Sequence, residues 1–325
     1  MEELFDKNPR IEVVDALRGF AVMAILLVHS LEHFIYPVYP QNTSEWMYIL
    51  DQGIFHTVFS LFAGKAYAIF ALLFGFTFYI QANNRKKAGK DFGYRFLWRL
   101  LLLAGFATIN AAFFPAGDVL LLFAIVGLVL FLTRNWSEKA ILITAVLFLL
   151  QPVEWCHYVA YLLNPEFFVS SEKNLPFWTK VLAISAILFA PLYTLKEVIM
   201  DGDTIIRQTA GTAFDMWQKL AFTGVLVASF ILLYQNRRFR STVDCLHYYG
   251  RMSLTNYLSQ SVIGAFIYFP VGLGLASLCG YTTSLLVGIV IFLMQIIFSD
   301  WWLWKHQQGP LERLWHKWTW WGANK

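Results

Sequence analysis

The first apolar run of the chain reads Asp15-Ala-Leu-Arg18-Gly-Phe-Ala-Val-Met-Ala-Ile-Leu-Leu-Val-His29. Its flanks extend the predicted helix to residues 12–35, which is long enough to cross the roughly 30 Å apolar layer of a membrane. Eleven steps from Arg18 to His29 make about three full turns, so both side chains share one face, about 16 Å apart along the axis. Charged groups at membrane depth cost at least about 2.5–3.5 kcal/mol each near the centre, and they seldom persist without a partner or a function. We therefore expect this helix to carry a functional surface.

The composition of the whole chain is that of a membrane protein. The 325 residues are 58% hydrophobic and only 14% charged, whereas an ordinary soluble domain is about 25% charged. We expect an all-α transmembrane bundle that forms one integral membrane domain over residues 1–325, without a soluble domain. Residues 1–150 would carry the candidate site, and residues 236–325 would form a C-terminal membrane segment. Further apolar runs lie near residues 53–81, 95–114, 117–133, 139–161, 177–196, 216–235, 252–270 and 282–304.

The basic residues predict the orientation of the chain. Lys and Arg cluster in residues 83–99, which marks that loop as cytoplasmic, while Tyr36–Gln52 contains neither and is expected to face outward. Asn236–Arg251 and the segment after residue 304 are also basic, so we expect both to be cytoplasmic. A total of nine spans would place Asn236–Arg251 outside the cell, so we expect eight or ten spans. These loops account for the formal charge of +4, and no nucleic-acid partner is expected.

His29 is the first candidate for chemistry. A neutral imidazole takes a proton near neutral pH, and a neighbouring carboxylate can orient it. Asp15, Glu32 or Asp118 could supply that carboxylate, and His33 lies within about 60° of the same helix stripe. His33 and Asp118 are also candidates for substrate binding, and for Asp118 the structural alternative is stabilisation of a helix N-terminus. For His29 it is a hydrogen bond to a neighbouring helix that serves packing alone.

Two basic side chains within apolar runs are candidates for binding an anion. Arg18 offers a planar fork that suits carboxylate or phosphate, although Asp15 three residues earlier could occupy it in an ion pair. Lys65 needs a counter-charge, a water-filled space or a route to the membrane surface. Both are therefore predicted to contact an anionic substrate or donor, with ion pairing and snorkelling as the structural alternatives.

The apolar run over residues 252–270 begins with an unusually polar segment. Ser253, Asn256 and Gln260 follow one another at three- and four-residue spacing and so share one helix face, and Arg251 precedes them. Such a face either bonds neighbouring helices or lines a cavity. Arg251, Asn256 and Gln260 are therefore further candidates for substrate binding.

Several classes of cofactor chemistry find no support in the sequence. No phosphate-binding loop, dinucleotide-binding glycine pattern, metalloprotease motif or nucleophile elbow is present. The three cysteines, Cys156, Cys245 and Cys279, match no zinc, haem or disulfide spacing. We therefore expect no metal site and no soluble cofactor domain.

Five blocks of sequence are distributed along nearly the whole chain. They are Val14-Asp-Ala-Leu-Arg-Gly-Phe-Ala, Gly64-Lys-Ala-Tyr-Ala-Ile-Phe-Ala-Leu-Leu-Phe-Gly-Phe, Gly117-Asp-Val-Leu, Gly250-Arg-Met-Ser-Leu-Thr-Asn-Tyr-Leu-Ser-Gln-Ser and Gly309-Pro-Leu-Glu-Arg-Leu-Trp. These blocks resemble, in order, those of the YeiB-like family of bacterial inner-membrane proteins. That family resembles, more distantly, the transmembrane acyltransferases, which include heparan-α-glucosaminide N-acetyltransferase and bacterial polysaccharide O-acyltransferases. In the latter, an arginine and a histidine in the first span form a signature pair, and Arg18 and His29 match its spacing.

The resemblance implies an activity and a location. The donor would be a cytoplasmic acyl-CoA, most simply acetyl-CoA, and the acceptor a hydroxyl or amine of a glycan, lipid or small molecule at the membrane. His29 would act as general base, assisted by Asp15 or Glu32, while Arg18 and Lys65 hold the anionic donor. Such a mechanism needs Arg18 and His29 to face a common solvated space. The protein would cross the bacterial cytoplasmic membrane several times, with both termini in the cytoplasm.

The sequence departs from the resembled family at two positions. Many YeiB-like sequences carry Asn where this chain has His29, and His where this chain has Asn110. A second class of function, a transporter or flippase of a small anionic or lipid-linked substrate, would use the same polar stripe to line a pathway. A third alternative is a non-catalytic partner subunit, and a homo-oligomer also stays open.

Overall fold

The computed structural model describes residues 11–32, 40, 43–87, 93–113, 119–134, 136–137, 139–140, 143–144, 175–200 and 205–321. Every regular element within these ranges is helical, which confirms the expected all-α class. The α-helices are α1 (Glu12–Glu32), α2 (Glu45–Phe62), α3 (Lys65–Lys87), α4 (Gly93–Phe113), α5 (Val119–Thr133), α9 (Leu175–Met200), α10 (Ile205–Tyr234), α11 (Arg237–Arg251), α12 (Ser253–Tyr268), α13 (Tyr281–Lys305) and α14 (Pro310–Thr319), with a short 3-10 helix, η2, over Leu275–Leu278.

Five helical stretches within the described part of the chain are long and apolar enough to cross a membrane. Val119–Thr133 is a shorter apolar helix. The predicted run over residues 139–161 lies almost entirely outside the described residues, so the expected total of eight or ten spans stays a prediction. The five stretches are Glu12–Leu31, Glu45–Ala82, Pro176–Thr194, Phe214–Tyr234 and Tyr281–Lys305.

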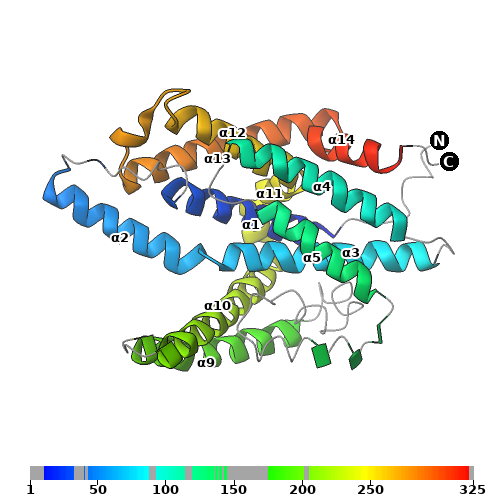
Figure 1. Ribbon diagram of the computed structural model, residues 1–325, viewed down its shortest axis with the longest axis horizontal. Helices are drawn as coiled ribbons and strands as arrows, with labels where there is room; N and C mark the ends of the chain where they lie inside the picture. The colour runs from blue at the N-terminus through cyan, green and yellow to red at the C-terminus, as the bar shows by residue number, and fades with distance from the viewer. Residues whose placement is uncertain are drawn as a thin grey trace.

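The long predicted run over residues 53–81 is interrupted at Gly64. This residue has a φ of 76°, a conformation that glycine adopts without steric cost. It separates α2 from α3, which follow one another along the long axis of the molecule (Figure 1). The ammonium group of Lys65 donates to the carbonyl of Ser60 at 2.7 Å, at the C-terminal end of α2, where a positive charge is favoured.

Helix α1 lies in the middle of the bundle (Figure 1), packed against α2, α3, α10, α11, α12 and α13. Its closest crossing is with α11, where Gly19 and Gly250 bring the two backbones into contact. A Cβ on Gly250 would lie only 1.8 Å from the carbonyl oxygen of Asp15, and one on Gly19 only 2.1 Å from that of Leu246. This crossing fixes the Asp15–Arg18 segment of α1 against α11.

The expectation of a loop over Asn236–Arg251 was wrong, because this segment is helix α11. The side chain of Asn236 caps it by accepting the backbone N–H of Arg238 at 2.9 Å. Leu246 and Tyr249 are buried, while the arginines near its start are exposed. The high charge that suggested a loop therefore belongs to one side of an amphipathic helix.

Helices α9 and α10 form an antiparallel pair that extends away from the other helices (Figure 1). Most residues of Pro176–Thr194 are not buried within the protein. The pair packs through small residues, since a Cβ on Gly224 would lie 2.3 Å from the hydroxyl oxygen of Ser185. An apolar helix with so little protein around it suits a lipid environment.

Candidate functional site

A partly open cavity of about 340 Å³ is lined by residues of α1, α3, α4, α5, α11, α12 and α14 and of the segment before α14. Small-molecule sites commonly range from about 300 to 1,000 Å³. Most of the lining is apolar and aromatic. The polar and charged lining comprises Arg18, Thr77, Gln81, Arg99, Arg251, Ser253, Gln308, Glu312, His316 and Thr319. We call this space the arginine cavity.

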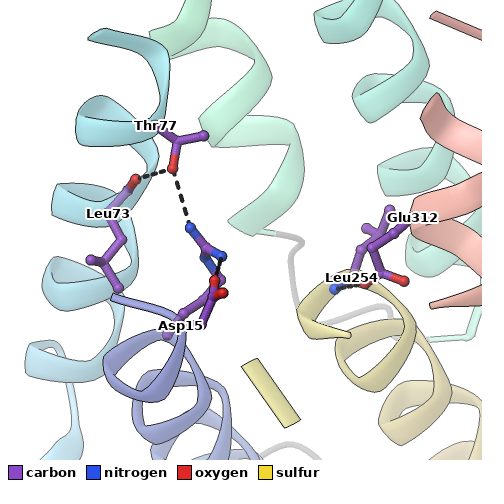
Figure 2. A network of polar contacts seen from close by, with 6 residues as sticks. Asp15, Leu73, Thr77, Leu254 and Glu312 are labelled. Atoms are coloured by element: carbon purple, nitrogen blue, oxygen red, sulfur yellow. Dashed lines mark hydrogen bonds and ion pairs between the residues drawn. The ribbon is translucent and has the colours of Figure 1, made fainter. Parts of the chain in front are cut away.

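Arg18 is held at the cavity wall by two neighbours. One guanidinium nitrogen pairs with the carboxylate of Asp15 at 2.7 Å, and the other donates to the hydroxyl of Thr77 at 3.2 Å (Figure 2). The Thr77 hydroxyl itself donates to the carbonyl of Leu73. The intrahelical ion pair with Asp15 is therefore present, and Arg18 lines the cavity at the same time.

The other two arginines reach the cavity from α4 and from the end of α11. Arg99 donates to the side-chain oxygen of Gln81 at 2.7 Å, and its guanidinium lies over the ring of Trp315, 4.5 Å from the centroid. Arg251 donates to the carbonyl of Gln307 at 2.9 Å. The lining contains three guanidinium groups and one carboxylate, and the carboxylate of Asp15 also pairs with Arg18. The remaining excess of positive charge favours an anion.

The carboxylate in the lining, Glu312, caps α12 from a different helix. One oxygen accepts the backbone N–H groups of Leu254 at 2.8 Å and Thr255 at 3.0 Å, and the other accepts the Thr255 hydroxyl at 2.5 Å. Figure 2 shows Glu312 beside Leu254. Burial raises the pKa of Glu312 above its usual value, while these hydrogen bonds act in the opposite direction. Its main role is to fix α14 against the start of α12.

His316 is a second titratable group of α14 in the cavity lining. Burial, and secondly the charge of Arg99, lower the pKa of His316 below its usual value of 6.5. This shift favours the uncharged form of the imidazole. Helix α14 is too short to cross a membrane, so this histidine lies outside the spanning segments.

His29 lies in a different environment from Arg18. It is 1% exposed, and its Nε2 is 2.6 Å from the hydroxyl of Tyr67. Its ring also contacts the ring of Tyr257, with centroids 6.1 Å apart, and Tyr257 lines the arginine cavity. His29 is not among the residues that line the arginine cavity, so the common space expected for Arg18 and His29 stays a prediction. Aromatic side chains from α3 and α12 enclose His29 instead.

Lys65 and Asn256, two further predicted site residues, are not among the residues that line the cavity. Lys65 is 4% exposed, with its ammonium 5.4 Å from the ring centroid of Phe222. Asn256 donates to the carbonyl of Tyr249 and to the hydroxyl of Ser299, which is the interhelical bonding given as its alternative.

The remaining candidates divide into those that the structure places and those that it does not. Gln260 is fully buried and is not among the described lining residues of the cavity. Arg251 is part of the cavity lining, and its role in substrate binding stays a prediction. The side chain of Glu32 is not described, and His33 and Asp118 lie outside the described residues.

Sequence reasoning missed three cavity residues, Arg99, Glu312 and His316. Arg99 was counted only as a loop charge, although it lies at the start of a long apolar run. Pro310 marks the start of a short helix. Within it, the steps from Glu312 to His316 and from His316 to Thr319 are four and three residues, which places all three on one face. This spacing could have predicted that one face of α14 lines the cavity.

Comparisons with known proteins place the chain among relatives without an assigned activity. Residues 162–322, just under half of the chain, match the family model described as "Protein of unknown function (DUF418)". The chain is 27% identical to "Uncharacterized protein YxaH" of Bacillus subtilis (strain 168), over 95% of this chain and 94% of that protein. It is 25% identical to "Uncharacterized 39.9 kDa protein in amylase 3'region" of Bacillus acidopullulyticus, over 96% of this chain and 94% of that protein. No solved structure matches.

Proposed function

We propose that this chain is a membrane-embedded acyltransferase that receives part of an acyl-CoA, most simply acetyl-CoA, in the arginine cavity. The acyl group would pass to a hydroxyl or amine of a glycan, lipid or small molecule at the membrane. One observation carries the proposal: three guanidinium groups and a wall of phenylalanine and leucine side chains line a single space of about 340 Å³.

The cavity suits both chemical parts of such a donor. Guanidinium groups bind phosphate oxygens through paired hydrogen bonds. Phe70, Phe74 and Phe123 supply an apolar surface for the acyl and pantetheine portions. Because the cavity is partly open, the rest of the donor can extend beyond it.

The proposed location is the bacterial cytoplasmic membrane, with the Arg18 end of α1 at the cytoplasmic face, where CoA is available. Basic residues next to the cavity support this orientation. Arg95 donates to the carbonyl of Thr319, and the guanidinium of Arg85 lies 4.2 Å from the ring centroid of Trp320. Trp315 and Trp318 on the same helix suit a membrane interface.

In the proposed reaction, His29 and Tyr67 form the proton-accepting pair. The acceptor hydroxyl or amine gives its proton to His29, directly or through Tyr67, and forms a bond to the thioester carbonyl carbon. The carbon–sulfur bond then breaks, and the CoA thiolate takes up the proton. Tyr257 contacts His29 and lines the cavity, so its side chain must change rotamer for the thioester to reach the pair.

Binding of CoA to the purified protein in detergent, measured by calorimetry, tests the donor site. Arg18→Gln and Arg251→Gln should each weaken CoA binding by about 10-fold or more, because a hydrogen bond to a charged group contributes about 1.5–3 kcal/mol. Arg238→Gln is the matched control, since Arg238 is exposed on α11 and is not part of the described cavity lining. Equal binding by all three variants, or no binding by the wild type, would defeat the proposal.

Turnover of radiolabelled acetyl-CoA tests the proton-accepting pair. His29→Ala should abolish acyl transfer while CoA binding persists, because His29 is absent from the described lining of the cavity. Transfer at the wild-type rate by this variant would exclude a catalytic role for His29.

A transporter or flippase of a small anionic or lipid-linked substrate is the second candidate. The observation that favours it is the enclosure of His29 by protein, because anion binding at Arg18 does not need a reactive histidine. Flux of such a substrate into proteoliposomes, without chemical change, would support this function over acyl transfer.

A further inference from the structure

Two arginines and a tryptophan from three segments meet at one end of the bundle. Arg85 lies in the last turn of α3, Arg95 in the first turn of α4, and Trp320 directly after α14. These three helix ends lie at the same end of the molecule (Figure 1). The guanidinium of Arg85 is 4.2 Å from the centroid of the Trp320 ring, and that of Arg95 is 5.6 Å from it. We call these three residues the arginine–tryptophan cluster.

Neither arginine of this cluster pairs with a carboxylate in the part of the chain that the structure describes. Arg95 donates to the backbone carbonyls of Thr319 at 3.0 Å and Trp321 at 3.4 Å. Arg85 makes no hydrogen bond to the described residues, and its contact is with the ring of Trp320. A guanidinium carries five N–H donors in its plane, so a contact with a ring leaves most of them available. The cluster therefore holds two positive charges with donors left for an anion.

The cluster is separate from the arginine cavity. Arg85, Arg95 and Trp320 are not among the residues that line that cavity, whereas Arg99, one turn further along α4, is. The side chains of Arg85 and Arg95 are partly exposed. An anion bound by these two arginines would therefore approach from the outer surface of the bundle.

The surroundings of the cluster are typical of a membrane–water interface. The apolar stretch Glu45–Ala82 ends three residues before Arg85. Aromatic side chains next to the cluster are exposed, with Tyr94 at 85%, Trp98 at 44% and Trp321 at 76%. Tryptophan and tyrosine are enriched where a membrane protein meets the lipid headgroups. The two guanidinium groups are therefore expected at the depth of lipid phosphates.

Helix α4 continues from the cluster with an exposed, mostly apolar face. After Trp98, exposed positions follow at Leu101, Gly105 and Ile109, in steps of three and four residues. No atom lies within 4 Å of a Cβ added to Gly105, so this face is open. From Trp98 to Ile109 the helix rises about 16 Å, close to half of the roughly 30 Å hydrocarbon layer. A fatty acyl chain can therefore lie along this face while its headgroup lies beside Arg95.

We propose that the arginine–tryptophan cluster and this face of α4 bind an anionic phospholipid, such as phosphatidylglycerol, from the surrounding bilayer. The lipid phosphate accepts hydrogen bonds from the two guanidinium groups, and one acyl chain packs on α4. Phosphatidylcholine binds more weakly, because its ammonium group would approach two positive charges while the described part of the cluster offers it no carboxylate. The inference depends neither on acyl transfer nor on CoA binding, so failure of either would leave it standing.

Thermal unfolding of the purified full-length protein in detergent micelles tests this lipid site. Phosphatidylglycerol or phosphatidylcholine with identical acyl chains is added at equal mole fraction, and the response is the difference in Tm between the two lipids. The wild type should have a higher Tm with phosphatidylglycerol. Arg85→Gln and Arg95→Gln should each lose about half of this response or more, because each removes one of two guanidinium groups.

Arg238→Gln is the matched control, because it removes one exposed arginine at the start of α11 and should keep the full response. Arg95→Gln also loses its bonds to two carbonyls, which lowers Tm in both lipids and cancels in the difference. Arg85→Gln loses no hydrogen bond to the described residues, so it tests lipid binding with little effect on folding.

Inorganic phosphate added to the phosphatidylcholine micelles separates a lipid from a free anion. It should not reproduce the response, because it lacks the acyl chain that packs on α4. The proposal is overturned if the wild type shows no response, if Arg85→Gln and Arg95→Gln respond as Arg238→Gln does, or if inorganic phosphate raises the Tm of the wild type equally.

Discussion

The two ends of helix α1 carry polar side chains on one face but place them in opposite environments. Near its start, the Arg18 side chain is 20% exposed and lines a partly open cavity. Three turns later, His29 is 1% exposed and packs against Tyr67 and Tyr257. Helical periodicity thus determines which residues share a face. Whether a residue on that face is accessible to solvent depends on side chains from other helices, and the periodicity of α1 cannot predict these.

Among substitutions near the two ends of α1, Gly250→Ala should lower the stability of the protein most. The added Cβ would lie 1.8 Å from the carbonyl of Asp15, so α11 must move away from the Arg18 end of α1. We expect the free energy of unfolding to fall by about 3 kcal/mol or more, measured by thermal unfolding in detergent. Gly105→Ala on α4 is the control, because no atom lies within 4 Å of its added Cβ. It should stabilise the protein by roughly 0.5–1 kcal/mol, and a similar loss in both variants would refute the close crossing.

A smaller effect at the same end should follow from Glu312→Ala. The substitution leaves the Leu254 and Thr255 N–H groups and the Thr255 hydroxyl without their acceptor. We expect the free energy of unfolding to fall by about 2–3 kcal/mol. CoA binding should also weaken, because α14 is held less firmly against α12. Asp244→Ala on the exposed side of α11 should change stability by less than about 0.5 kcal/mol. Equal effects would mean that Glu312 does not cap α12.

The two ends can be compared directly by removing one hydroxyl at each. Tyr67→Phe removes a hydrogen-bond partner of the buried His29, and we expect the free energy of unfolding to fall by about 1–2 kcal/mol. Thr77→Val removes a partner of Arg18 beside the cavity, where water can replace it, and should cost less than about 1 kcal/mol. Urea unfolding of both variants measures the difference. A larger loss from Thr77→Val would reverse the contrast described above.

The smallest effect should be the pH dependence contributed by His316. As pH falls through 6.5, the unfolded state takes up a proton on this imidazole, while the folded state keeps it neutral to lower pH. The unfolded state then binds more protons, so stability falls below pH 6.5. His316→Gln should flatten this decline in Tm, whereas Glu312, whose pKa is raised, contributes the opposite slope in both proteins. An unchanged Tm profile would exclude this contribution.

The helices could be predicted from sequence because membrane-length apolar runs are a local property. The run over 282–304 corresponds to Tyr281–Lys305, and the run over 95–114 to Gly93–Phe113. The site could be predicted only in part. Arg18 and Arg251 were candidates, but Arg99 and Glu312 meet them only through long-range packing. The enclosure of His29 depends on Tyr67 and Tyr257, which come from two other helices.

Helix α14 follows every other wall of the cavity along the chain. During translation, α1, α3, α4, α5 and α12 therefore leave the ribosome before Glu312 exists to accept the first N–H groups of α12. Until that moment the nascent protein has the three arginines of the cavity but lacks the wall that α14 supplies. The arginine cavity is consequently completed late in biosynthesis, after its other walls have been made.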